Sequence, residues 1–186
     1  MVRTIYTIWI GLLLLWLITS VSVKPSQRRQ PPASRLGQMI LVIAGFGLIF
    51  DESIPFEWLH TRLWPDAQAA WIAGLALTIA GALFAIWARF SLGRNWSSSV
   101  TVKQGHELQR SGPYAIVRHP IYSGLLLALL GTAIAFGEIR GLIGVALAGI
   151  GWRLKSLVEE RFMLEEFGEQ YTRYRHDVNA LIPFVY

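Results

Sequence analysis

The sequence predicts an all-α integral membrane protein with about five transmembrane helices, and three observations carry this prediction. First, 53% of its 186 residues are hydrophobic and only 16% are charged, which is too apolar for an ordinary soluble domain. Second, long apolar runs alternate with short polar ones, and the mean hydropathy is +0.42. Third, basic residues gather in some of the polar runs and are sparse in the others.

The remaining composition narrows the class of protein further. The chain has no cysteine, which excludes disulfides, zinc–thiolate sites and cysteine nucleophiles. The formal net charge of +5 is carried by polar runs between apolar segments, so membrane topology explains it better than nucleic-acid binding does. We therefore expect membrane lipid around the protein, no nucleic-acid partner and no metal site, and leave its oligomeric state open.

The first third of the chain contains two candidate spans and a linker. Residues 5–23 are long enough to cross the hydrocarbon core. The alternative is a secretory signal peptide with Arg3 as its basic start, but the run is long for one and Val21-Ser22-Val23 is a poor cleavage site. Residues 24–35 are basic and proline-containing, and we expect a linker without regular structure. Residues 36–50 form a second, short span.

Three further spans follow, and the last two are expected to pair. Residues 67–87 form the third span and residues 121–137 the fourth, with Pro120 in the first helical turn, where its missing N–H is no loss. A tight turn at residues 138–141 leads to the fifth span at residues 142–157, so the fourth and fifth helices form an antiparallel hairpin. Residues 159–174 carry charges on most faces and continue this helix into water.

Loop charges orient these spans. Residues 24–35, residues 89–118 and the C-terminal region are basic, whereas residues 51–66 and the turn at residues 138–141 are not. Because cytoplasmic loops carry an excess of Lys and Arg, the N-terminus is expected outside the cell and the C-terminus in the cytoplasm.

This topology gathers the polar residues that stand out in the sequence. The start of the fourth helix lies beside the end of the fifth, so Arg118, His119 and Tyr122 should face Glu159 and Glu160 across a cleft at the membrane surface. Backbone N–H groups at the start of a helix can also face an anionic ligand.

These residues also carry a resemblance to a known family. The motifs are Gly112-Pro113-Tyr114, Arg118-His119-Pro120-Ile121-Tyr122-x-Gly124, Glu159-Glu160 and Phe167-Gly168-x-x-Tyr171-x-x-Tyr174. In this order, with a helical hairpin between them, they resemble the isoprenylcysteine carboxyl methyltransferase family, which is related to the phospholipid N-methyltransferases. The resemblance covers residues 92–183, and we treat residues 1–186 as a single membrane-embedded methyltransferase domain.

The resemblance implies methyl transfer from S-adenosyl-L-methionine, in a cytoplasmic pocket, to the carboxylate of a C-terminal isoprenylcysteine or similar lipophilic acid that enters from the bilayer. Arg118 and Lys155 are the implied catalytic residues, and the acceptor carboxylate would be bound by Lys155 with Arg153 or Arg161. Lys155 stands where the family has an arginine, and it lacks the bidentate fork of that residue. The implied donor-binding residues are His106, Glu107, Leu108, Gln109, Tyr114, His119, Pro120, Ile121, Tyr122, Glu159 and Glu160.

Structural alternatives exist for several of these residues. Arg118 and Lys155 are equally well explained as interfacial cations. Glu160 taken alone is slightly better explained as a surface acid. For Tyr114 and Tyr122, the alternative is a place among the aromatic residues of the membrane interface. Tyr171 and Tyr174, three residues apart, are expected to pack the C-terminal helix rather than to contact a ligand.

Two other functions stay open. One is an N- or S-methyltransferase acting on a phospholipid or a small lipophilic substrate, in which an amine would need His119 or Glu160 as its base. The other is a non-catalytic or reductase-like membrane protein built on the same scaffold.

Overall fold

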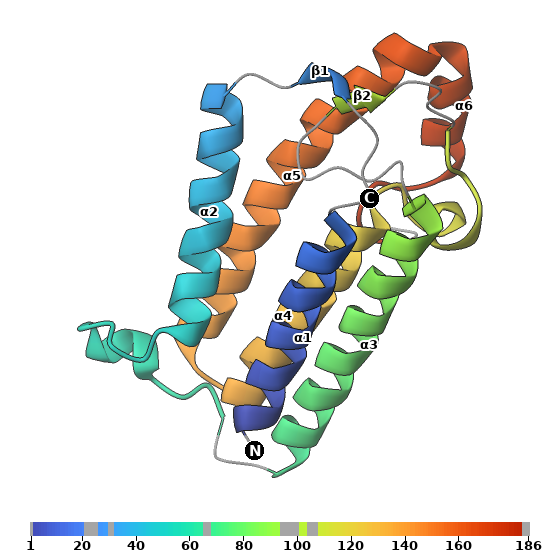
Figure 1. The fold of residues 1–186 in the computed structure, drawn as a ribbon. Helices are drawn as coiled ribbons and strands as arrows, with labels where there is room; N and C mark the ends of the chain where they lie inside the picture. The colour runs from blue at the N-terminus through green and yellow to red at the C-terminus, as the bar shows by residue number, and fades with distance from the viewer. Residues whose placement is uncertain are drawn as a thin grey trace.

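The computed structural model describes residues 2–20, 26–29, 32–64, 68–93, 101–103 and 108–183. Apolar helices dominate this part of the chain, which confirms the predicted all-α membrane class (Figure 1). Four helices are long and apolar enough to cross a bilayer. A shorter apolar helix, Pro120–Phe136, lies between the third and the fourth of them in the sequence. The protein is a multi-pass integral membrane protein.

The five apolar helices are α1 (Val2–Ser20), α2 (Pro32–Phe50), α3 (Gln68–Leu92), α4 (Pro120–Phe136) and α5 (Ile139–Phe167). They run alternately up and down, so the start of α1 and the end of α5 lie at opposite ends of the bundle (Figure 1). Each predicted span therefore exists, with boundaries shifted by a few residues. Helix α2 begins at Pro32 instead of residue 36 and is thereby long enough to span, while α3 and α5 continue past the expected ends of their spans, to Leu92 and Phe167.

Small residues bring the helices of each neighbouring pair into close contact. A side-chain Cβ at Gly81 of α3 would lie 2.4 Å from the backbone N of Ala128 in α4, so only glycine fits there. Gly144 of α5 is as close to α2, because its Cβ would lie 2.5 Å from the carbonyl O of Gly45. Close backbone approach of this kind is a main source of stability between helices in lipid. The bundle therefore consists of an α3–α4 pair and an α2–α5 pair, which the predicted α4–α5 hairpin joins.

Helix α1 is attached to this bundle by a few polar contacts. The indole Nε1 of Trp9 donates to Thr132 Oγ1 at 3.0 Å, and Thr132 Oγ1 lies 3.3 Å from Thr78 Oγ1. At the other end of α1, an Arg89 guanidinium nitrogen donates to the carbonyl of Thr19 at 2.7 Å. Most other side chains of α1 point away from the protein, as expected for a helix that faces lipid.

The prediction of an unstructured basic linker at residues 24–35 is wrong for its described part. Strand β1 (Ser26–Arg29) pairs antiparallel with β2 (Thr101–Lys103), and α2 has already begun at Pro32. This ribbon satisfies backbone hydrogen bonds of two loops at the same end of the bundle. Its partner strands are distant in sequence, and a local composition of Pro, Gln and Arg gives no sign of such pairing.

The two turns near the fifth span also differ from expectation. Gly137 adopts a left-handed conformation with φ of 69° and ends α4, and α5 begins at Ile139, so the turn is shorter than residues 138–141. The expected continuous helix to residue 174 is interrupted at Gly168, which has φ of 50°. A separate helix, α6 (Glu169–Asp177), then folds back over the end of the bundle (Figure 1). Glycine is the residue that tolerates both conformations.

Candidate functional site

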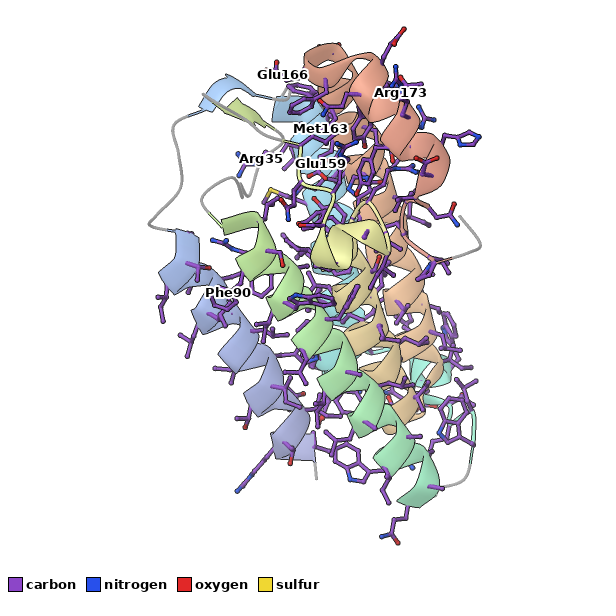
Figure 2. The ribbon with its side chains drawn as sticks, turned by 90° about the vertical axis from the view of Figure 1, so that its right-hand side faces the viewer. Arg35, Phe90, Glu159, Met163, Glu166 and Arg173 are labelled. Carbon is purple, nitrogen blue, oxygen red and sulfur yellow. The ribbon has the colours of Figure 1, made fainter. Side chains whose placement is uncertain are left out.

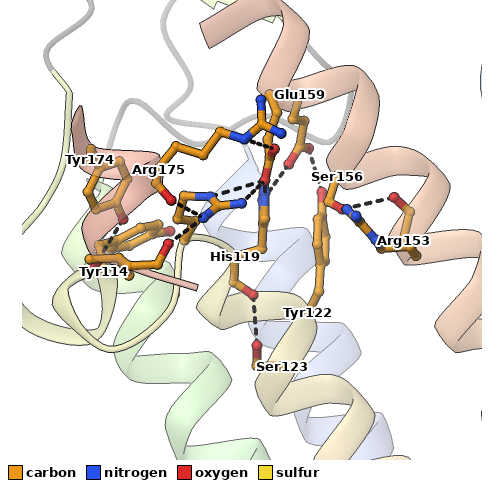
Figure 3. A network of polar contacts seen from close by, with 12 residues as sticks. Tyr114, His119, Tyr122, Ser123, Arg153, Ser156, Glu159, Tyr174 and Arg175 are labelled. Carbon is orange, nitrogen blue, oxygen red and sulfur yellow. Dashed lines mark hydrogen bonds and ion pairs between the residues drawn. The ribbon is translucent and has the colours of Figure 1, made fainter. Parts of the chain in front are cut away.

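The candidate site lies where the start of α4 meets the later part of α5, as the hairpin topology predicted. Figure 2 shows that Glu159 lies closer to the middle of the bundle than Glu166 and Arg173, which lie further out, at the tip of the molecule. The short 3-10 helix η3 (Gly112–Ala115) precedes α4 in the chain. In the close-up, Arg118 and His119 from the loop before α4 and the two glutamates from α5 form one polar network (Figure 3). The predicted juxtaposition of these residues is confirmed.

His119 is the centre of the network, because each of its ring nitrogens contacts a different glutamate. Nδ1 lies 3.2 Å from Glu159 Oε2, and Nε2 lies 3.2 Å from Glu160 Oε1, while the side chain is only 8% exposed. Ionised carboxylates only accept hydrogen bonds, so both ring nitrogens donate and the ring is an imidazolium. Burial lowers the pKa of His119, but its hydrogen bonds to Glu159 and Glu160 outweigh burial and raise the pKa above its usual value.

Glu159 is the more accessible of the two glutamates. Its side chain is 23% exposed, against 5% for Glu160, and Tyr122 Oη donates to Glu159 Oε1 at 2.5 Å. The Tyr122 ring stacks on His119 with centroids 5.8 Å apart and on Trp152 with centroids 6.2 Å apart. Lys155 Nζ lies 5.4 Å from the centroid of the same ring. An accessible carboxylate, a cation and aromatic faces are thus adjacent.

Glu160 has a different surrounding. Arg118 donates to Glu160 Oε1 from Nε at 3.1 Å and from a terminal nitrogen at 2.7 Å, and Arg175 Nε lies 3.4 Å from Glu160 Oε2. With His119, three basic side chains therefore surround one carboxylate that is almost fully buried. The interpretation of Glu160 as a surface acid is wrong, and so is that of Arg118 as an interfacial cation, since its side chain is 9% exposed.

Three tyrosines of the motifs, Tyr114, Tyr171 and Tyr174, are buried within the protein. Tyr114 lies in η3, and its backbone carbonyl accepts a hydrogen bond of 2.6 Å from Tyr174 Oη. Burial raises the pKa of the Tyr114 phenol well above its usual value, so the phenol stays neutral. Tyr171 and Tyr174 pack α6 against the bundle with their rings 5.9 Å apart, as expected. Tyr114 is therefore not an exposed aromatic residue of the membrane interface, whereas Tyr122 is half-buried and hydrogen-bonded to Glu159.

The other candidate residues are spread around this network. Pro120 and Ile121 are buried in the first turn of α4, Leu108 is half-buried, and Gln109 Nε2 donates to Ser111 Oγ at 3.0 Å. On α5, Arg153 donates to Ser156 Oγ at 3.3 Å and Arg161 is exposed. His106 and Glu107 lie outside the described residues.

Two partners of the site were missed from the sequence. Trp152 lies on the same face of α5 as Glu159, seven residues away, and this helical spacing was a usable signal. Arg175 reaches Glu160 only because the chain reverses at Gly168, so no local pattern points to it.

Comparison with known proteins agrees with this arrangement. A model of the phospholipid methyltransferase family matches residues 69–170. The chain is 31% identical to protein-S-isoprenylcysteine O-methyltransferase B of Arabidopsis thaliana over 63% of this chain and 62% of that protein. It is 30% identical to a probable protein-S-isoprenylcysteine O-methyltransferase of Oryza sativa subsp. indica over 66% of this chain and 68% of that protein. The human relative is 31% identical, and the match covers 49% of its length.

The solved structure of a eukaryotic intramembrane Ras methyltransferase, isoprenylcysteine carboxyl methyltransferase, shares the fold. The TM-score is 0.52 at 25% sequence identity, and the match covers 86% of this chain and 55% of that one. The chain thus spans about half to two thirds of the relatives it matches. From the matched family model, the shared fold and the motif residues assembled at one site, the chain belongs to the isoprenylcysteine carboxyl methyltransferase family.

Proposed function

We propose that this chain is a membrane methyltransferase that uses S-adenosyl-L-methionine, the methyl donor of its family, to esterify the carboxylate of a C-terminal isoprenylcysteine or a similar lipophilic acid. The observation that carries the proposal is the convergence of both motif halves on one site, where His119 bridges Glu159 and Glu160. Relatives named as protein-S-isoprenylcysteine O-methyltransferases point to the same reaction.

The side chains at the site fit such a donor. Bound S-adenosyl-L-methionine supplies an electrophilic methyl group on a sulfonium, and it also carries an ammonium, a carboxylate and ribose hydroxyls. Glu159 keeps an accessible face that accepts hydrogen bonds from ammonium or hydroxyl groups. The stacked rings of Tyr122 and Trp152 offer aromatic faces for a cation or an adenine. Leu108, Gln109 and Tyr114, with His106 and Glu107, complete the proposed donor-binding set.

The acceptor side of the proposal rests on Lys155. Its ammonium lies over the Tyr122 ring, beside Glu159, where an acceptor carboxylate would reach both the cation and the donor-binding residues. A carboxylate is already ionised at pH 7, so its reaction needs alignment and exclusion of water rather than a base. Arg153 and Arg161 are the proposed supporting cations for this group.

The match to the phospholipid methyltransferase family favours a second candidate, methylation of a lipid amine. An amine nucleophile requires deprotonation, and His119 and Glu160 are the candidate bases at this site. Both ring nitrogens of His119 face carboxylates, and Glu160 is enclosed by arginines, which makes either residue a poor base. This surrounding supports the carboxylate acceptor over the amine.

Calorimetry with S-adenosyl-L-methionine in detergent tests the donor, and it also tests the non-catalytic and reductase-like alternatives. We expect binding by the wild type and its loss in Glu159→Ala, because that change removes polar contacts in a partly dry site. Glu166→Ala, on the same helix but exposed, is the matched control. Absence of heat with the wild type would contradict both methyltransferase functions.

Transfer of a radiolabelled methyl group then tests the acceptor. The panel contains a prenylcysteine analogue, phosphatidylethanolamine and a small thiol. A base-labile methyl ester formed on the prenylcysteine analogue is the expected product. A base-stable product on the amine or the thiol would support the alternative.

The proposed orientation places the N-terminus outside and the site in the cytoplasm, as the loop charges favour. Because the chain has no cysteine, single-cysteine variants can report sidedness. Phe56 and Ile182 are both exposed. They lie toward opposite ends of the bundle, because Phe56 follows the end of α2, whereas Ile182 follows residues that are bonded to the start of α4. We expect a membrane-impermeant maleimide to label Phe56→Cys on intact cells, and Ile182→Cys only after permeabilisation. The reverse pattern would invert the orientation.

A further inference from the structure

The described C-terminal residues make an unusual set of contacts with the start of α4. The backbone N–H of Arg118 donates to the carbonyl of Asn179 at 2.8 Å, and that of His119 donates to Ala180 at 3.0 Å. One turn into α4, Ser123 Oγ donates to the carbonyl of Leu181 at 2.5 Å. The backbone carbonyls of three consecutive residues, 179–181, therefore accept hydrogen bonds from the segment that carries His119.

These contacts change the interpretation of the helix start. Backbone N–H groups at the start of a helix can face an anionic ligand, but those of Arg118 and His119 are occupied by the carbonyls of Asn179 and Ala180. Ala180 and Leu181 are 3% and 9% exposed, so this contact is part of the protein interior. The backbone at His119 is thus held by the last part of the chain.

The side chain of Arg118 joins the same contacts to the glutamates. Besides its two hydrogen bonds to Glu160, its guanidinium donates to the carbonyl of Arg175 at 3.0 Å and to the carbonyl of Val178. The carbonyls at the end of α6 attract a cation, since the helix dipole is negative there. Arg118 therefore connects α5 with the end of α6 and with the residues that follow α6. Few N–H groups of its guanidinium are left to bind a ligand.

We propose that residues 178–181 act as a strap that holds His119 in its position between the glutamates, and that Arg118 is a positioning residue which fastens this strap. The proposal rests on the proposed function, because it concerns the geometry of the donor-binding site. It assigns Arg118 a role different from the direct catalytic one that the family resemblance implies. Opening of the strap would release His119 and weaken donor binding without touching Glu159.

The absence of native cysteine allows strap opening to be measured directly. In Ala180→Cys the thiol is part of the strap and is buried while the strap is closed, because the native side chain is 3% exposed. In Ile182→Cys, two residues further, the thiol is exposed in either state, because the native side chain is 55% exposed. Reaction with N-ethylmaleimide in detergent then reports opening, and Leu181→Cys is a second buried reporter should Ala180→Cys fold poorly.

The closed strap is expected to make Ala180→Cys react at least tenfold more slowly than Ile182→Cys. Adding Ser123→Ala, which removes one strap hydrogen bond, should accelerate the Ala180→Cys reaction about fivefold. Arg118→Lys keeps a cation near Glu160 but cannot reach the strap carbonyls at the same time, so it should accelerate the reaction similarly. Thr172→Ala, at an exposed position of α6, is the matched control and should change nothing. Saturating S-adenosyl-L-methionine should slow the reaction at Ala180→Cys.

Equal labelling of Ala180→Cys in the wild-type, Ser123→Ala and Arg118→Lys backgrounds would overturn the strap. If calorimetry shows that the donor binds but the labelling rate of Ala180→Cys does not change, the role of the strap in positioning His119 is overturned. If no donor binds, while the two substitutions still accelerate labelling, the strap stands and the proposed function fails.

Discussion

Replacement of Glu160 by glutamine tests whether the two consecutive glutamates have different roles. Glu160→Gln keeps the size of the side chain but removes the charge that faces Arg118 and His119, both of which are at most 9% exposed. Breaking a buried ion pair by removing one partner typically costs about 3–5 kcal/mol. The contact with Arg175 adds little, because that side chain is 51% exposed. We expect a loss of about 3 kcal/mol or more.

The corresponding loss for Glu159→Gln is smaller, because Glu159 is partly exposed and its ordered partners are Tyr122 and His119. One or two such hydrogen bonds correspond to about 1–2 kcal/mol. For a chain of this size, each kcal/mol lowers the unfolding temperature by roughly 2–4 °C. Glu160→Gln should therefore lower it at least about 1.5 times as far as Glu159→Gln, whereas only Glu159→Gln should abolish donor binding without a large loss of stability.

Thermal unfolding in detergent, followed by the fluorescence of the 8 tryptophans, measures both effects. Glu166→Gln on the exposed part of α5 is the control and should stay within about 0.5 kcal/mol of the wild type. The double variant Arg118→Gln/Glu160→Gln should be more stable than the sum of the two single losses, since neither charge is then left unpaired. Strict additivity, or a larger loss in Glu159→Gln, would refute the assignment of Glu160 to structure.

Three further predictions concern the acceptor, the helix contacts and the central histidine. Lys155→Ala should raise the Michaelis constant for the acceptor and leave donor affinity nearly unchanged in calorimetry; loss of donor binding would contradict this division of roles. Gly81→Ala should cost about 2 kcal/mol by thermal unfolding, because its Cβ would lie 2.4 Å from a backbone N of α4, whereas Gly11→Ala, with nothing within 4 Å, should be neutral or mildly stabilising. Because the folded-state pKa of His119 is raised above 6.5, its contribution to stability is fully present below about pH 6.5 and is lost as the pH rises through the folded-state value. The unfolding temperature should fall over that range, and His119→Gln should flatten the fall.

Much of the architecture could be predicted because lipid imposes simple rules on a sequence. Long apolar runs must be helices, and an odd number of them places the chain ends on opposite sides. The same topology brings the start of α4 beside the end of α5, so the contacts of His119 with Glu159 and Glu160 followed without knowledge of any side-chain detail. Pro120 in the first helical turn was likewise predictable from its lack of an N–H group.

What could not be predicted depends on contacts between distant segments outside the apolar runs. Pairing of β1 with β2 requires two polar loops to meet, and neither has a strand pattern. The reversal at Gly168 brings Arg175 to Glu160, although a glycine within a charged segment is compatible with several conformations. The burial of Glu160 follows from this reversal, which is why the same residue looked like a surface acid in the sequence.

Two consecutive glutamates lie about 100° apart around a helix, so their side chains point in different directions. In α5 this angle places Glu160 against Arg118 and Arg175 and leaves Glu159 beside Tyr122 and Lys155, and His119 is the only one of these residues that contacts both. A charged imidazolium there compensates part of the negative charge of the pair without supplying a base. That arrangement suits an acceptor that arrives ionised, for which alignment of the reactants accounts for most of the catalysis. The proposed strap is consistent with these buried charges, because water reaching Arg118 or Glu160 would weaken the pair that holds His119 in place.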